Sequence, residues 1–92
     1  MRYTWNPDKE RRNVAKHGIA FGTAIRIFQG PVVERTDIRF DYGEERVQAF
    51  GIVDDRVIVV VYTEREKDEI RIISARRAKP KEAQEYYEEL GF

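Results

Sequence analysis

The stretch RVIVVVYTER, residues 56–65, holds an unbroken apolar run from Val57 to Tyr62. A strand this apolar is expected at the centre of a sheet, with both of its faces covered. Shorter runs on either side alternate between apolar and polar residues, as half-exposed strands do. These runs are residues 31–37, 46–53 and 70–78. Three or four antiparallel strands that follow one another are therefore predicted.

A surface helix is predicted before these strands, from Pro7 to His17. Asn6 is a good N-cap, and proline is well suited to the first helical position. Gly18 then follows as a stop signal. The helix has few apolar residues, so only a thin stripe of it is expected to face inward.

Two further helices show apolar residues at helical spacing. The first precedes the stop signal at Gly30, and its stripe consists of Phe21, Ala24, Ile25 and Phe28. The second begins at Pro80, and its stripe consists of Ala83, Tyr86, Tyr87 and Leu90. The predicted fold class is therefore α+β, with two N-terminal helices and one C-terminal helix packed on a three- or four-stranded antiparallel sheet. Residues 1–92 are expected to form a single domain.

The composition excludes several classes of protein. The chain has no cysteine, which rules out a disulfide scaffold and thiol catalysis. Its 17 basic and 17 acidic residues balance, so net charge alone does not indicate a nucleic-acid partner. No apolar run approaches the roughly 20 residues of a membrane span. We expect a cytoplasmic protein with no membrane partner.

The last predicted strand carries an unusual density of arginine, in RIISARRAKP at residues 71–80. Regular alternation places Arg76 on one face of the sheet and Arg71 and Arg77 on the other. Guanidinium groups are well suited to phosphate because they stay charged and offer a planar fork of donors. The alternative is that these arginines pair with nearby carboxylates and only hold the last helix to the sheet.

His17 is the only histidine, and histidine is the side chain that exchanges protons most readily near neutral pH. A lone histidine before a glycine is nevertheless more often a helix-end residue than a catalyst. With one histidine and no cysteine, a metal site is not expected, and no cofactor is indicated. Tyr62 is among the aromatic residues that could stack on RNA bases.

Three segments together resemble the BrnT family of bacterial and archaeal toxins. They are WNPDKERRNVAKHGIAFGTAIRIF, GEERVQAFGIVDDRVIVVVYTER and IRIISARRAKPKEAQEYY. The most specific parts are KHGIAF and RIISARRA, and the family usually has an acid where this chain has Asn6. The resemblance implies a fold akin to the RelE ribonuclease toxins and an RNA-cleaving activity that inhibits translation. It also implies neutralisation by a BrnA-like ribbon-helix-helix antitoxin, in a toxin–antitoxin heterotetramer that meets operator DNA only through the antitoxin.

An RNA-cleaving site needs only proton transfer and charge stabilisation, because the 2′-hydroxyl of the substrate is the nucleophile. We expect Lys16 and His17 to approach one end of the sheet, where Arg46, Arg65, Arg76 or Arg77 clamps the scissile phosphate. The catalytic candidates are His17, Lys16, Arg65, Arg76, Arg77 and Glu64, with Glu45 as the other choice for the second proton-transfer group. The RNA-binding candidates are Arg46, Arg71 and Tyr62.

Two other functions fit the same residues. The chain could be a non-catalytic module that binds nucleic acid or an acidic partner through these arginines. It could also be an interaction protein whose arginine face serves mainly to be covered by an antitoxin. Turnover of RNA separates the enzyme from both.

Overall fold

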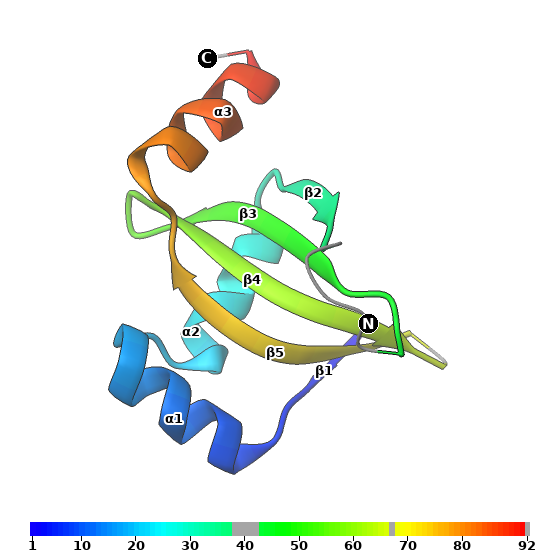
Figure 1. Cartoon of the computed structure of the whole chain (residues 1–92). Helices are drawn as coiled ribbons and strands as arrows, with labels where there is room; N and C mark the ends of the chain where they lie inside the picture. The colour runs from blue at the N-terminus through cyan, green and yellow to red at the C-terminus, as the bar shows by residue number, and fades with distance from the viewer. Residues whose placement is uncertain (38–42, 67, 92) are drawn as a thin grey trace.

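The computed structural model describes residues 1–37, 43–66 and 68–91, which build an α+β molecule around one mixed sheet (Figure 1). The elements are β1 (Arg2–Thr4), α1 (Pro7–His17), α2 (Phe21–Ala24), the 3-10 helix η1 (Ile25–Gln29), β2 (Val33–Thr36), β3 (Val47–Val53), β4 (Arg56–Arg65), β5 (Glu69–Arg77) and α3 (Pro80–Leu90). The described strands lie in the order β1-β5-β4-β3-β2. Neighbours from β5 to β2 are antiparallel, as predicted.

The prediction omits one strand, β1, which pairs in parallel with β5. Its three residues are too few to show a period, so the expectation of three or four antiparallel strands was wrong on this point. The hydroxyl of Thr4 donates to a carboxylate oxygen of Glu69 at 2.7 Å, and the Arg2 amide donates to the Asp68 carbonyl at 2.9 Å. The parallel pair thus depends on contacts made far along the chain.

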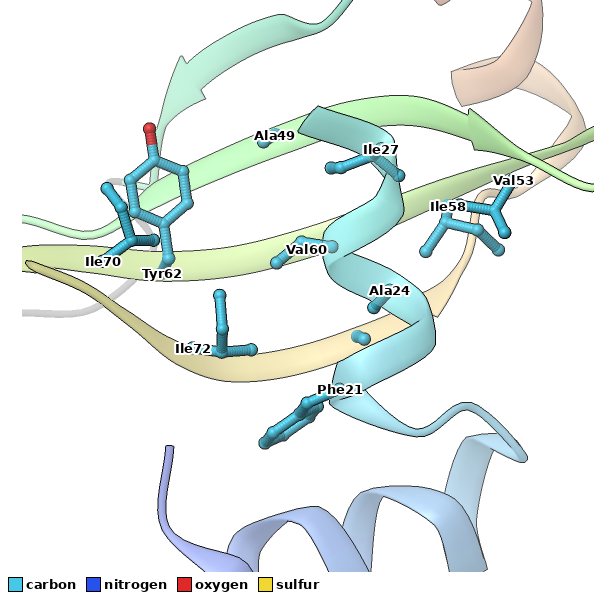
Figure 2. Packing of buried hydrophobic residues seen from close by; sticks show 11 residues of the cluster. Phe21, Ala24, Ile27, Ala49, Val53, Ile58, Val60, Tyr62, Ile70 and Ile72 are labelled. Carbon is cyan, nitrogen blue, oxygen red and sulfur yellow. The ribbon is translucent and has the colours of Figure 1, made fainter. Parts of the chain in front are cut away.

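The strand β4 occupies the centre of the sheet, as its sequence indicates. Every side chain from Val57 to Tyr62 is at most 6% exposed. One face of β4 packs under α2 and η1 (Figure 2), and the other packs under Tyr86 of α3. Burying one such side chain contributes about 1.5–3 kcal/mol, so this strand is a main source of the stability of the fold.

The helix α1 begins and ends at the predicted residues. The side-chain oxygen of Asn6 accepts hydrogen bonds from the backbone amides of Asp8 and Lys9, at 2.8 and 3.2 Å. At the other end Gly18 has φ 73°, in the left-handed region that favours glycine, and its amide donates to the Val14 carbonyl at 2.8 Å. Both boundaries are therefore set by local chemistry.

The second predicted helix is one turn of α-helix followed by a 3-10 helix. Its fully buried residues are Phe21, Ala24 and Ile27, spaced by three as a 3-10 helix requires (Figure 2). Ile25 and Phe28 of the predicted stripe are only partly buried. The segment lies so close to β3 that a Cβ atom on Gly51 would be 2.6 Å from the Cβ of Ile27.

A β-bulge in β5 changes which arginines share a face. The register pairs Tyr62 with Ile72 but Val61 with Ser74, so β5 holds one extra residue at Ile73. Beyond the bulge Ala75 and Arg77 lie on the α2 side, whereas Ser74 and Arg76 lie on the α3 side. Regular alternation was therefore wrong in grouping Arg77 with Arg71.

The helix α3 begins at Pro80, as predicted, and ends at Leu90, with Gly91 as its C-cap in the left-handed region. Its predicted stripe is confirmed, since Tyr86 is buried and the other three residues pack against the same cluster. The Tyr86 hydroxyl donates to the Pro31 carbonyl at 2.7 Å. This bond ties α3 to the chain just before β2.

Candidate functional site

The pairing register separates the predicted phosphate-binding arginines. Arg65 lies opposite Glu69 at one end of β4, and Arg77 lies opposite Ile58 near the other end. The seven residue steps from Ile58 to Arg65 span roughly 23 Å along the strand. Arg65 and Arg77 therefore lie too far apart to contact the same phosphate. Arg46 lies at the Arg65 end, next to Val47, which pairs with Tyr62.

The helix α1 brings His17 to the Arg77 end of the sheet. The side-chain amide of Asn13 donates to the Ala75 carbonyl at 2.8 Å and accepts from the Ala75 amide at 3.1 Å. His17 is one helical turn beyond Asn13, and Arg77 is two strand residues beyond Ala75 on the same sheet face. Because α1 and β5 run in the same direction (Figure 1), His17 and Arg77 lie at the same end of the molecule.

Lys16 and Arg56 add positive charge to this end. Lys16 is exposed beside the half-buried His17, and Arg56 begins β4. The side chains of Arg56 and Arg77 form no ion pair with any residue that the structure describes. A hollow of about 120 Å³ lies beside Arg56, between α2 and the β3–β4 turn, whereas Arg77 lines a second hollow with Arg56 and residues of α3. The lining of the first hollow includes Gly18, Thr23, Asp54 and Arg56.

Arg76 has a structural role on the other face. Its guanidinium donates to both carboxylate oxygens of Glu82, at 2.8 and 2.9 Å. Arg76, by hydrogen bonding, and then the Lys79 amide lower the pKa of Glu82 to about 2, against the opposing effect of burial. The reading in which an arginine holds the last helix to the sheet therefore applies to Arg76.

A second cationic group consists of Arg46 and Arg71 and lies on the α3 side of the sheet. Thr63 is 3% exposed, and its hydroxyl donates to the Glu45 carbonyl at 2.8 Å. Arg71 lies opposite Thr63 on β5 and is half-buried. Its side chain has no ion pair or hydrogen bond with a described residue. Arg46 is close to Glu44, with 3.6 Å between its Nε and a carboxylate oxygen.

Tyr62 was wrongly expected to stack on RNA. Its ring is 3% exposed and packs edge to face on Phe28, with 5.8 Å between ring centres. The hydroxyl donates to the carboxylate of Glu34. Burial, together with this carboxylate, raises the pKa of Tyr62 well above its usual range. Tyr62 is therefore a core residue with a neutral hydroxyl.

The carboxylates proposed as second proton-transfer groups also lie far from His17. Glu64 pairs with Ile70 and shares a hollow with Glu44, Glu45 and Thr63 at the Arg65 end. Neither Glu64 nor Glu45 can serve the same phosphate as His17. Their proposed partnership with His17 was therefore wrong.

Sequence reasoning missed the side chains that position α1. Besides Asn13, Glu10 accepts a hydrogen bond from the Phe21 amide at 2.9 Å and so holds α2 against α1. Asparagine is a poor helix former, so an asparagine inside a helix with strong end signals indicates that its side chain is used in a tertiary contact. The contact itself joins residues 62 positions apart, which no local pattern reveals.

Metal-binding clusters and membrane-spanning helices are absent from the described part of the chain. Residues 1–37, 43–66 and 68–91 contain no group of three acidic or histidine side chains placed to hold a metal ion. None of the helices in these ranges is both long and apolar enough to cross a bilayer.

Comparison with known families decides the identity. The family model described as "Ribonuclease toxin, BrnT, of type II toxin-antitoxin system" matches residues 5–82. The chain belongs to the BrnT toxin family. The match includes α1, the β-sheet from β2 to β5 and the start of α3, so it covers both cationic groups described above.

A solved BrnT structure supports the fold. The chain is similar to the ribonuclease toxin BrnT of Brucella abortus, whose crystal structure was determined at 1.1 Å resolution, with a TM-score of 0.66 and 23% sequence identity. The similarity covers 86% of this chain and 97% of the Brucella protein. At this identity it establishes the shared fold alone. No curated protein matches the sequence significantly.

Proposed function

We propose that this BrnT-family chain is an endoribonuclease that cleaves RNA without a metal ion and thereby inhibits translation. The match of residues 5–82 to a family of ribonuclease toxins carries the proposal. The grouping of His17, Lys16 and Arg77 at one end of the sheet supports the choice of site.

The proposed reaction uses the substrate's own nucleophile. The 2′-oxygen attacks phosphorus, the bond to the 5′-oxygen breaks, and the products are a 2′,3′-cyclic phosphate and a 5′-hydroxyl. His17 accepts the proton of the 2′-hydroxyl, and Lys16 supplies a proton to the departing 5′-oxygen. Arg77 and Arg56 stabilise the additional negative charge on the phosphate oxygens.

The partners follow from the family as proposals. We infer that a BrnA-like ribbon-helix-helix antitoxin neutralises this chain, in an assembly of two toxins and two antitoxins that binds operator DNA only through the antitoxin. Kinship with RelE ribonucleases and action in the cytoplasm belong to the same proposal.

The test is turnover of RNA in excess EDTA, with detection of 2′,3′-cyclic phosphate ends. Loss of an essential proton-transfer group lowers the rate by about 10²–10⁴-fold, so His17→Ala should be folded and nearly inactive. Arg26→Ala is a matched control, because Arg26 is an exposed cation that pairs with Asp54. A His17→Ala protein as active as the parent would remove His17 from the mechanism.

A non-catalytic nucleic-acid binding module is the second candidate. Arg71 favours it, because its guanidinium pairs with no described residue and lies on the sheet face opposite Arg77. Binding of RNA without any cyclic phosphate product would support this candidate over the enzyme.

A further inference from the structure

We propose that the chain carries a cationic belt that binds successive phosphates of single-stranded RNA and leads the strand to His17. The belt consists of Lys9, Arg12, Lys16 and Arg71. The inference rests on the proposed function and deepens it, because it specifies how the substrate lies on the protein.

The position of α1 is the first step. Asn13 bonds to both backbone groups of Ala75, as a neighbouring strand would, so α1 lies against the edge of β5. Both views of the molecule show α1 beyond β5, while α2 covers one face of the sheet (Figures 1 and 2). One side of α1 is therefore turned to the α2 face and the opposite side to the α3 face.

Helical geometry shows which residues take each side. Glu10 contacts the start of α2, so its side of α1 belongs to the α2 face. Residues follow one another at about 100° around an α-helix, which places Lys9, Arg12 and Lys16 on the far side of Asn13 from Glu10. All three are exposed. They form a row along the flank of α1 that turns toward the α3 face.

Arg71 continues this row on the sheet. Its neighbour on β1 is Thr4, and α1 begins three residues after Thr4, at Pro7. Arg71 therefore lies near the N-terminal end of the α1 flank, on the α3 face. The row runs from Arg71 past Lys9 to Lys16, and His17 follows about 100° further round the helix, on the Glu10 side of Asn13.

The charges of the belt are unmatched within the described residues, whereas several other cations are paired with carboxylates. The belt side chains form no ion pair with a described residue. By contrast, Arg35 pairs with Glu89, Arg76 with Glu82, and Arg11 with Asp8. Because the chain has no net charge and the belt has no ion pairs with described residues, the belt is available to bind the anionic groups of a ligand.

The shape of the belt favours one strand of RNA. From Lys9 to Lys16 the helix rises about 10 Å, and the cations follow one helix flank and one strand edge. A single phosphate backbone can follow such a line, and each phosphate it places on a cation releases condensed counterions.

The experiment measures binding of a labelled single-stranded 2′-deoxy oligonucleotide at several salt concentrations. This probe lacks the 2′-hydroxyl, so it cannot be cleaved by the proposed route. Each phosphate contact changes the slope of log affinity against log salt by about −0.7, so four contacts predict a loss of about 50-fold between about 50 and 200 mM salt. Lys9→Ala or Arg12→Ala should reduce this loss to about 18-fold.

Arg11→Ala is the matched control, since it removes an arginine from the same helix outside the belt and should keep the parental slope. Parental slopes in both Lys9→Ala and Arg12→Ala would overturn the belt. If these variants kept their slopes but lost affinity for poly-L-glutamate, the belt would instead be a surface that binds an acidic protein. If the variants showed reduced slopes but the parent did not cleave RNA, the RNA-binding belt would be supported and the proposed ribonuclease activity would be rejected.

Discussion

The side chain of Asn13 forms two hydrogen bonds with the backbone of Ala75, at 2.8 and 3.1 Å, and thereby fixes α1 on the edge of β5. The same amide nitrogen also donates to the Ile19 carbonyl at 2.8 Å, at the start of the turn to α2. One buried amide thus joins α1, the turn that follows it and the last strand.

Removing the side-chain amide of Asn13 should destabilise the protein substantially, although the substitution removes only a few atoms. Asn13→Ala leaves buried backbone groups of Ala75 without partners, and we expect a loss of about 2 kcal/mol in the free energy of unfolding. Urea denaturation measures it, with Val14→Ala, at an exposed position of the same helix, as the control. Equal stability of Asn13→Ala and the parent would contradict the role assigned to Asn13.

The close approach of η1 to β3 gives a second expectation. An added Cβ at Gly51 would meet the Cβ of Ile27 at 2.6 Å, so Gly51→Ala must displace η1 and should cost about 1–3 kcal/mol. The control is Gly22→Ala, where the new methyl group meets nothing within 4 Å and the helix should gain up to about 1 kcal/mol. Thermal unfolding of both variants checks the contrast, and similar melting temperatures would refute it.

The Arg76–Glu82 pair should make the free energy of unfolding decrease at low pH. The pKa of Glu82 is lowered to about 2 in the folded protein from 4.5, so its stabilisation is present above about pH 4.5 and is lost as the pH falls toward 2. Allowing for partial exposure, the loss is on the order of 2 kcal/mol. Urea unfolding of Glu82→Gln at pH 7 and pH 3 should show a smaller pH dependence than the parent. Glu88→Gln, at an exposed site, should behave as the parent does.

Tyr62→Phe separates a core role from RNA stacking. The variant loses the hydrogen bond to Glu34, and we expect a destabilisation of about 1 kcal/mol. Its affinity for the single-stranded probe should equal that of the parent, because the ring is buried. Fluorescence binding assays measure this affinity, and a large decrease in a folded Tyr62→Phe protein would restore Tyr62 to the RNA site.

Elements with local signals could be predicted from the sequence. The limits of α1 are set by Asn6, Pro7 and Gly18, all of which act within the helix ends themselves. The centre of the sheet follows from the uninterrupted apolar run of β4, and α3 from its stripe of apolar residues. In each case the physical cause lies within about a dozen residues of sequence.

The features that sequence reasoning missed depend on distant contacts. The parallel strand β1 exists because β5 offers it a partner, and the bulge at Ile73 depends on the register between β4 and β5. That bulge decides which arginines share a face. The candidate site was therefore only partly predictable, since the residue types were evident but the ends and faces of the sheet on which they lie were not.

The parallel pairing of β1 with β5 has a consequence for how the protein is made. Arg2 and Glu69 are 67 positions apart, so the first strand to leave the ribosome must wait for almost the last. Contacts that join such distant residues form late and slowly. Since Ala75 also holds the helix that carries His17, the proposed catalytic end of the molecule cannot assemble in a nascent chain until synthesis is nearly finished.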